Sequence, residues 1–271
     1  MKEVLDWAIK LAGIIALAYL ILLIFVYFWQ RKLLYYPDSE RADAAELQQA
    51  QLQEWPPDPE QPFRGLLGGQ LTSPKGTVLV FHGNAGAAWH RFYYSHALGK
   101  LGYRVILAEY PGYGGRPGSP SESTLVNDAV ASLDLALQRF PEPVYVWGES
   151  LGAGVAAALV QQRPDHIKGT ILLTPWDTLP DLASHYYPYL PVKWLIRDHY
   201  PSTLNLQGYS GRIALIIAAQ DEIIPVNHSM TLFDSISTEK QLWQFPDAGH
   251  NSWPFNADEP WWSDVMQFVS E

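Results

Sequence analysis

The chain has 271 residues, which suits one large α/β domain or two small ones. It carries 18 Lys and Arg residues against 28 Asp and Glu residues, so its net charge is −10, and no run of basic residues stands out. This balance argues against nucleic-acid binding, which needs a basic surface. The chain has no cysteine, which excludes disulfides, thiolate metal sites and cysteine catalysis.

Residues 1–36 are predicted to form a membrane anchor. An uncharged apolar run extends from Leu11 to Trp29, and a helix of this length is about 28 Å long, close to the thickness of the bilayer hydrocarbon. We therefore predict one transmembrane helix over about residues 11–29, flanked by basic residues and by Tyr and Trp. A cleaved signal peptide is the alternative, but the run is longer than a usual signal core and bulky residues follow it.

Residues 37–61 are predicted to be a juxtamembrane linker, with a helix over Asp38–Gln53 and a break at "EWPPDPEQP". The remaining residues, 62–271, are predicted to form one catalytic domain that begins with a weak strand or hairpin over Gly65–Thr72. Six apolar runs then alternate with helical stretches, and they lie in "GTVLVFHGNAG", "YRVILAEYPGYG", "PVYVWGES", "GTILLTPW", "RIALIIAAQD" and "KQLWQFPDAGH". This alternation predicts an α/β fold with a mostly parallel sheet covered by helices on both faces.

The segment Gly148–Gly152, "GESLG", matches the G-x-S-x-G pattern of a nucleophile elbow, between a predicted strand and a predicted helix. Glycine is expected at both ends of the motif, Gly148 and Gly152, because so tight a turn leaves no room for side chains there. Strained backbone angles would lift the hydroxyl of Ser150 clear of the sheet. We therefore predict Ser150 as a nucleophile, against the alternative of an ordinary strand–loop–helix corner.

A serine hydroxyl needs a base to take its proton, and His250 in "PDAGHNS" follows the last predicted strand. Asp221 directly follows the preceding strand and is the predicted acid that orients the imidazole. Glu222 and Asp177 are alternative acids, since each also follows an apolar run. The chain order of Ser150, Asp221 and His250 is the nucleophile–acid–base order of α/β-hydrolases.

An acyl-transfer site also needs two donors for the oxyanion of the tetrahedral intermediate. The backbone N–H of Leu151, directly after the nucleophile, is the first candidate. The second is the backbone N–H of Asn84 in "HGNAG", the turn after the first strong strand. His82, at the end of that strand, is predicted to shape the loop by hydrogen bonding rather than to act in catalysis.

These motifs resemble the Bem46/ABHD13/ABHD17-like group of membrane-associated serine hydrolases within the α/β-hydrolases. The matching stretches include "VFHGNAG", "EYPGYGGRPGSPSE", "WGESLGAGVA", "DEIIP" and "AGHN". The resemblance implies the same roles for Ser150, Asp221 and His250, and it favours a non-cytoplasmic catalytic domain, which the nearly equal charges beside the apolar run do not decide. The chain departs from the group at Ala218, where a glycine is usual, and in a short first hairpin.

The predicted function is hydrolysis of an ester or thioester, with a lipid-like or other acyl substrate suggested by the anchor and by an aromatic-rich cap segment over about residues 177–211. Acyl-protein thioesterase or peptidase specificity are alternatives within the enzyme class. A non-catalytic, membrane-tethered interaction protein on the same scaffold is the alternative outside it. We predict no cofactor and no metal, because the sequence has no H-E-x-x-H motif and no paired His and carboxylate cluster.

Overall fold

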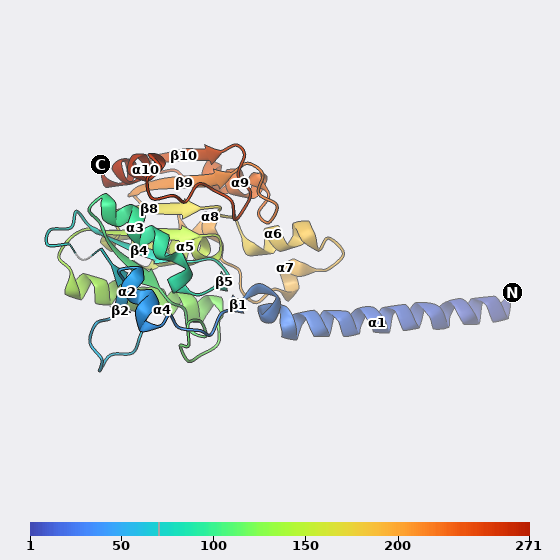
Figure 1. Cartoon of the computed structure of the whole chain (residues 1–271). Coiled ribbons are helices and arrows are strands. Elements are labelled where there is room, and N and C mark those ends of the chain that lie inside the picture. The colour runs from blue at the N-terminus through green and yellow to red at the C-terminus, as the bar shows by residue number, and fades with distance from the viewer. Residues whose placement is uncertain (70) are drawn as a thin grey trace.

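A computed structural model describes residues 1–69 and 71–271. Its centre is an eight-stranded sheet with the strand order β10-β9-β8-β7-β4-β6-β3-β2 (Figure 1). The strands are β2 (Gln53–Trp55), β3 (Gly65–Gly68), β4 (Thr77–Phe81), β6 (Arg104–Ala108), β7 (Val144–Glu149), β8 (Gly169–Leu173), β9 (Arg212–Ala218) and β10 (Lys240–Phe245). From β10 to β6, all neighbouring strands pair in parallel. At the other edge, β3 pairs antiparallel with both β6 and β2. The predicted α/β fold with a mostly parallel sheet is confirmed.

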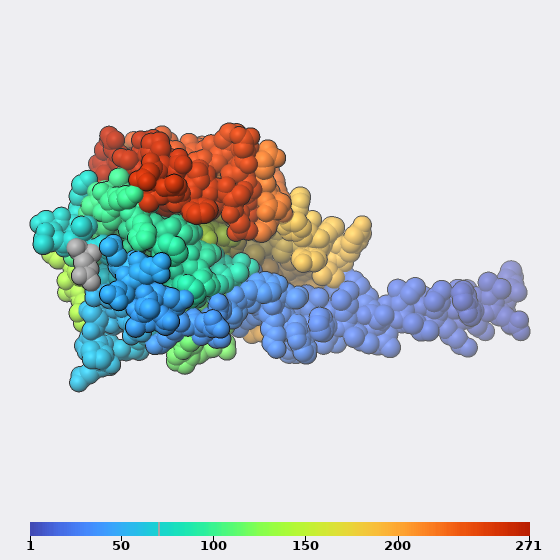
Figure 2. Space-filling view, viewed as in Figure 1, coloured from blue at the N-terminus to red at the C-terminus, as the bar shows by residue number. Residues whose placement is uncertain are grey.

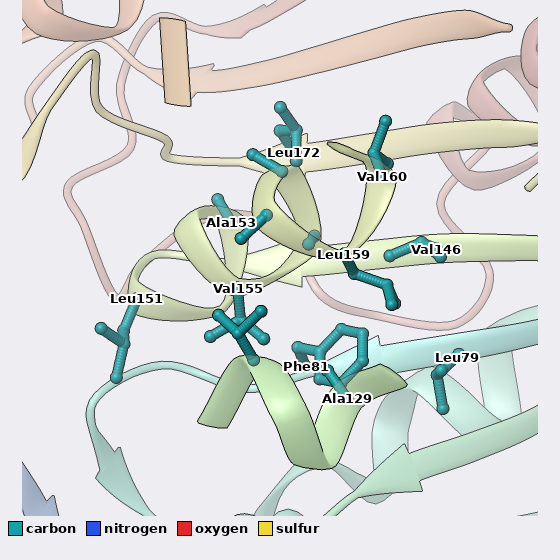
Figure 3. Close-up of a cluster of buried hydrophobic side chains, with 14 of the residues drawn as sticks. Leu79, Phe81, Ala129, Val146, Leu151, Ala153, Val155, Leu159, Val160 and Leu172 are labelled. Atoms are coloured by element: carbon teal, nitrogen blue, oxygen red, sulfur yellow. The ribbon is translucent and has the colours of Figure 1, made fainter. Parts of the chain in front are cut away.

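Helices cover both faces of the sheet because its central strands are apolar on both sides. In β7, Val144 and Val146 pack into one core, whereas Tyr145 and Trp147 pack into the other, as the two-residue period of a strand requires. The first core, part of which is shown in Figure 3, lies under the helices α4 (Glu122–Arg139) and α5 (Leu151–Gln162). The second lies under α3 (Phe92–Lys100) and α10 (Trp261–Ser270).

The N-terminal helix α1 (Lys2–Leu34) is longer than the predicted span and has no buried residue. Figures 1 and 2 show it as a rod that projects from the rounded body. Within the part of the chain that the structure describes, α1 is the one helix long and apolar enough to cross a membrane. Directly after it, β1 (Tyr36–Pro37) pairs with β5 (Ala85–Gly86), the turn that follows β4. The base of α1 is therefore attached to a loop at the carboxyl end of the sheet.

The segment that follows is more closely attached to the domain than the sequence indicated. The helix expected over Asp38–Gln53 is reduced to α2 (Ala44–Gln49), which begins where the side chain of Asp43 caps it in a capping box with Glu46. The strand β2 then forms the edge of the main sheet, and its Trp55 is fully buried against Phe140. The expected hairpin over residues 65–72 contains β3, and Gln70 within it lies outside the described residues.

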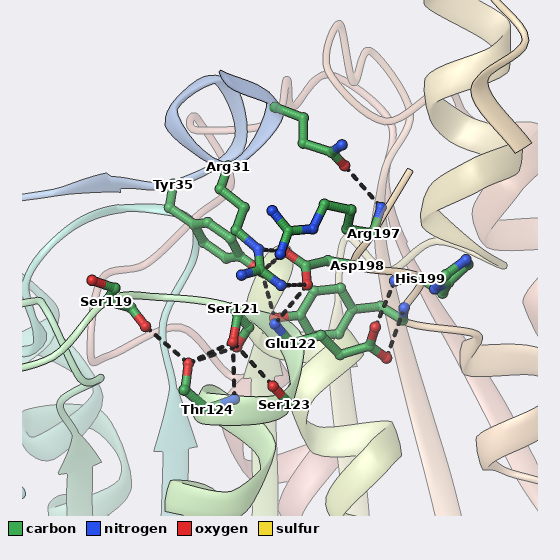
Figure 4. Close-up of polar contacts among 12 residues, drawn as sticks. Arg31, Tyr35, Ser119, Ser121, Glu122, Ser123, Thr124, Arg197, Asp198 and His199 are labelled. Atoms are coloured by element: carbon green, nitrogen blue, oxygen red, sulfur yellow. Dashed lines mark hydrogen bonds and ion pairs between the residues drawn. The ribbon is translucent and has the colours of Figure 1, made fainter. Parts of the chain in front are cut away.

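A cap inserted between β8 and β9 lies beside the base of α1 (Figures 1 and 2). It consists of α6 (Leu179–Tyr186), α7 (Val192–Leu195) and α8 (Ser202–Asn205). The guanidinium of Arg31 on α1 donates to both carboxylate oxygens of Asp198 in the cap, at 2.9 and 2.8 Å. The same carboxylate accepts from the backbone N–H of Glu122 at the start of α4 (Figure 4). This ion pair fastens α1 to the cap and to the sheet domain.

Three further short elements complete the described fold: the 3₁₀ helices η1 (Ala88–Arg91) and η2 (Pro164–His166), and the helix α9 (Val226–Ser235) that connects β9 to β10. The carboxyl ends of β4, β7, β8, β9 and β10 meet at one edge of the sheet, next to the cap. In open α/β sheets this edge is where ligands bind.

Candidate active site

Ser150 occupies the sharp turn between β7 and α5, with φ of 54° and ψ of −115°. A non-glycine residue at such angles is strained and is held there by its surroundings. The surroundings are tight: a Cβ at Gly148 would clash with the carbonyl oxygen of Gly152, and one at Gly152 would clash with that of Phe81. The two glycines that the sequence singled out therefore have a steric reason to be glycine.

The structure brings Ser150, His250 and Asp221 into one hydrogen-bonded chain. His250 Nε2 lies 3.0 Å from Ser150 Oγ, and His250 Nδ1 lies 2.8 Å from Asp221 Oδ2. An ionised carboxylate only accepts, so Nδ1 carries the proton and Nε2 is free to accept from the serine hydroxyl. The other oxygen of Asp221 accepts from the backbone N–H groups of Ile223 and Ile224, which fixes the carboxylate.

The two alternative acids have other partners. Glu222 accepts the backbone N–H of His250 at 3.1 Å, so it holds the histidine loop rather than the imidazole. Asp177, at the end of β8, lies 2.8 Å from Nδ1 of a different histidine, His228 on α9. The geometry therefore favours Asp221 as the carboxylate that orients His250.

The loop after β4 lies directly beside the serine, since a Cβ at Gly83 would be 3.6 Å from the Cβ of Ser150. In this loop the Asn84 carbonyl accepts from Tyr36 N at 2.9 Å and from the Tyr113 hydroxyl at 2.8 Å. The Asn84 side chain donates to the carbonyl of Leu34, at the end of α1. None of these bonds uses the backbone N–H of Asn84.

The other candidate donor, the N–H of Leu151, is the first of α5, where helical N–H groups have no intrahelical acceptor. His82 is buried, and its two ring nitrogens lie 2.7 Å from the Gly83 carbonyl and 3.2 Å from a Glu109 carboxylate oxygen. It therefore shapes the loop, as expected. Among the residues that the structure describes, no group of three or more His, Cys, Asp or Glu residues is arranged to hold a metal ion.

A buried ionic cluster beneath the nucleophile was missed at the level of sequence. Glu149, the residue before Ser150, is bound by the Arg91 guanidinium at 2.9 Å and by the hydroxyls of Tyr93 and Tyr94. Burial raises the pKa of Glu149, but the Arg91 charge and these hydrogen bonds outweigh it, and the net pKa is lowered. Arg91 is far away in the chain, so only the folded sheet brings the pair together.

An apolar cavity of about 340 Å³ lies between the base of α1 and the cap. Two of its wall residues are tied to the site: Ile223 donates to Asp221, and the carbonyl of Leu34 accepts from Asn84. Ser150 is not itself in the wall. The cavity is large enough for a small-molecule ligand and is lined mainly by aliphatic and aromatic side chains, including Val26, Leu182, Tyr187 and Leu195.

The parallel sheet and the serine elbow define the α/β-hydrolase class, and comparisons with known proteins agree. A protein-family model described as serine aminopeptidase, S33, matches residues 72–202. The uncharacterized protein Rv2307c of Mycobacterium tuberculosis is 33% identical over 252 residues, which cover 90% of this chain and 88% of that protein. The chain therefore has the α/β-hydrolase fold, is related over nearly its whole length to Rv2307c, and matches the S33 family of hydrolases over residues 72–202.

A lysophosphatidylserine lipase, ABHD12 of Danio rerio, is 33% identical over 186 residues, and the match spans 61% of this chain and 48% of that protein. The chain thus corresponds to about half the length of that relative. Among solved structures, the esterase Pf2001 of Pyrococcus furiosus superposes with a TM-score of 0.65 over 86% of this chain and 98% of that chain, at 17% identity. At that identity the likeness shows the fold alone. The narrower resemblance to the Bem46/ABHD13/ABHD17-like group stays a prediction.

Proposed function

We propose that this chain is a membrane-anchored serine esterase that cleaves an acyl ester or thioester through an acyl-enzyme intermediate. The observation that carries the proposal is the hydrogen-bonded chain from Asp221 through His250 to Ser150, at a strained elbow on the carboxyl edge of the sheet. The distance of 3.0 Å from Ser150 Oγ to His250 Nε2 supports proton transfer from serine to imidazole, since it lies within hydrogen-bond reach.

In the proposed mechanism, His250 Nε2 takes the hydroxyl proton while Ser150 Oγ attacks the carbonyl carbon of the substrate. The N–H groups of Leu151 and Asn84 stabilise the resulting oxyanion. When the tetrahedral intermediate collapses, the imidazolium returns its proton to the leaving alcohol or thiol. Water, deprotonated by the same nitrogen, then attacks the acyl-enzyme, and Ser150 leaves with the proton and is regenerated with release of the acid. Asp221 stabilises the imidazolium in both steps.

We assign the substrate to lipid-like acyl esters, because the apolar cavity adjoins both the turn of Asp221 and the loop of Asn84. The name of ABHD12, a lysophosphatidylserine lipase, supports the same class. Peptidase activity is the second candidate, because the matching family model carries an aminopeptidase name. An aminopeptidase site needs a free carboxylate for the ammonium group of its substrate, and the carboxylate in the cavity wall, Asp198, is already paired with Arg31.

We also propose that α1 is the membrane anchor and that the catalytic domain lies on the non-cytoplasmic side. The anchor is supported by the long, apolar and unburied helix, and the side is supported only by the sequence resemblance. Fusion of a compartment-specific reporter after Glu271 tests the side. A signal typical of the cytoplasm would contradict the proposed orientation without affecting the esterase assignment.

The esterase proposal is tested with a fluorophosphonate probe on the folded, full-length protein, followed by a chain-length series of p-nitrophenyl esters and a panel of aminoacyl amides. We expect the wild type to be labelled, Ser150→Ala not to be labelled, and medium or long acyl chains to be preferred over acetate. Absence of labelling in the wild type would favour the non-catalytic scaffold. Faster turnover of the amides than of any ester would favour the peptidase.

A further inference from the structure

The tip of the cap, defined here as Tyr186–Trp194, extends along the anchor helix. Near the base of the helix, the side chain of Gln30 donates to the carbonyl of Leu195, just after the tip. Further out, the hydroxyl of Tyr19 donates to the carbonyl of Tyr189 at 2.8 Å. The helix rises about 16 Å between these two contacts. The cap tip therefore follows α1 over three turns, on the side toward its N-terminus.

This contact places the cap tip at the depth of the predicted transmembrane segment. Tyr19 stands ten residues before Trp29, the end of that segment, and a helix rises about 15 Å over ten residues. That is about half the thickness of the bilayer hydrocarbon. If instead the membrane crossed only the part of α1 before Tyr19, the span would have to include four charged residues, Lys2, Glu3, Asp6 and Lys10. Charges in a span are unfavourable, so this alternative is disfavoured.

The surface of the cap tip has the chemistry of a membrane-contact surface. Two of its large side chains are almost fully exposed, Tyr189 at 88% and Trp194 at 90%, whereas Tyr187, in the cavity wall, is 57% exposed. Trp194 directly precedes Leu195, which contacts Gln30 near the end of the predicted span, so Trp194 would lie near the membrane–water boundary, where Trp is enriched. The one charged residue of the tip, Lys193, pairs with Asp181 at 2.6 Å and has a long side chain that can reach toward water.

The backbone of the cap tip is also suited to a nonpolar medium, in which every free N–H group is unfavourable. Pro188 and Pro191 have no N–H group. The N–H groups of Tyr187, Leu190, Val192 and Trp194 all donate to carbonyl oxygens of the cap itself. Six of the nine tip residues thus present no free backbone donor.

We propose that the cap tip is a second membrane-contact element, inserted into the bilayer beside α1, and that the cavity between the two takes the acyl chain of its substrate directly from the lipid. The proposal rests on the anchor and the esterase activity proposed above. It specifies the substrate as an ester that resides in the bilayer, with its chain in the cavity and its carbonyl near Ser150. The aromatic tip would then border the lipid-facing entrance.

Because the natural chain has no cysteine, single cysteines can report the depth of chosen positions. We would label Tyr189→Cys in the tip, Leu17→Cys in the anchor and Ser237→Cys, an exposed residue before β10, with an environment-sensitive fluorophore. The full-length variants are reconstituted in phosphatidylcholine vesicles that carry nitroxide on their acyl chains. We expect quenching of the labels at Tyr189→Cys and Leu17→Cys and none at Ser237→Cys.

The outcomes separate the cap tip from the anchor. Quenching at Leu17→Cys without quenching at Tyr189→Cys would overturn the tip insertion and leave the anchor standing. No quenching at either position would overturn the anchor and with it this inference. A label at Tyr189→Cys that reports a nonpolar environment without quenching by lipid would indicate a protein partner on the tip and would also overturn the proposal.

Activity gives an independent test. Trp194→Asp places a charge on the exposed tip but outside the cavity wall, so hydrolysis of a long-chain ester presented in phosphatidylcholine vesicles should fall about tenfold or more. Hydrolysis of a water-soluble butyrate ester should not change, and Ser237→Asp should affect neither substrate. Equal losses on both substrates would assign Trp194 to the packing of the enzyme and overturn the proposal, as would undiminished activity on the vesicles.

Discussion

Two of the buried pairs of a carboxylate and an imidazole, His250–Asp221 and His228–Asp177, lie close to the ends of the neighbouring strands β9 and β8, and they differ in what the second ring nitrogen contacts. Asp221 and Asp177 lie at the same distance, 2.8 Å, from Nδ1 of His250 and of His228 respectively. Nε2 of His250 faces the serine hydroxyl, whereas Nε2 of His228 is buried without a hydrogen-bond partner among the described residues. An Asp–His pair is thus not by itself a catalytic feature.

The difference comes from the elements that carry the histidines. His250 lies in the loop after β10. The hydrogen bond from its backbone N–H to the Glu222 carboxylate holds this loop beside the elbow. His228 sits in the first turn of α9 and is buried between the cap and the sheet, with the ring of His185 at 5.9 Å. In the proposed mechanism the first pair moves a proton, whereas the second connects α9 to the segment after β8.

Removing each imidazole gives the largest expected contrast. His250→Ala should lower kcat for a p-nitrophenyl ester by about 10⁴- to 10⁶-fold, because no base remains for Ser150. His228→Ala should leave kcat within a few-fold and lower the free energy of unfolding by about 1–3 kcal/mol, because buried Asp177 loses a partner. Ester kinetics and urea unfolding of both variants are the measurements. A large loss of kcat in a folded, stable His228→Ala protein would contradict the assignment of a structural role to His228 and a catalytic role to His250.

The carboxylates provide the next contrast. Asp221→Asn should lower kcat by about 10⁴-fold, since an amide no longer holds the imidazole in the required tautomer. Asp177→Asn should leave kcat nearly unchanged, as should Glu222→Gln if Glu222 only supports the loop. The same ester assay checks all three. If Asp177→Asn were the more damaging change, the acid would have to be reassigned to the end of β8.

The sequence could predict the fold because its central strands are nearly continuous apolar runs that alternate with helical stretches. It also pointed to Ser150, His250 and Asp221, each of which directly follows a strand or its turn. It favoured Asp221 over Asp177 only because Asp221 directly follows its apolar run, and the choice in fact depends on which histidine the tertiary structure brings near. Nor could it find the edge strand at Gln53–Trp55, which is short and is followed by prolines.

The sequence also could not predict that Arg91 is the buried partner of Glu149. This pair differs from the two Asp–His pairs because the partner of the carboxylate is permanently charged. Arg91→Ala should lower the free energy of unfolding at neutral pH by about 3–5 kcal/mol, because a buried charge is left unpaired. Arg91→Lys, which keeps the charge, should lower the free energy of unfolding by less than Arg91→Ala. Urea unfolding at several pH values measures both effects.

The contribution of Glu149 to the free energy of unfolding should change with pH in opposite directions in the wild type and in Arg91→Ala. In the wild type the pKa of Glu149 is lowered below its ordinary value of 4.5, so its stabilising contribution is present above that pH and is lost as the pH falls through the lowered pKa. In Arg91→Ala, burial without the cation should raise this pKa, so the deficit relative to the wild type should shrink as the pH falls from neutral. A deficit that stays constant with pH would indicate lost packing rather than lost charge.

The smallest expected effect concerns the loop that distinguishes the two pairs, since only the His250 pair has a candidate oxyanion donor beside it. Asn84→Ala keeps the backbone N–H but removes the bond from the side chain to Leu34, so kcat should fall by about fivefold or less. Tyr113→Phe removes the other side-chain tether of Asn84 and should have a similar effect. A loss above about 10²-fold for Asn84→Ala would mean that its amide contacts the reacting groups directly, because a loss of that size is typical of a removed oxyanion donor. No loss in either variant would mean that β1 alone holds the loop, through the bond from Tyr36 to the Asn84 carbonyl.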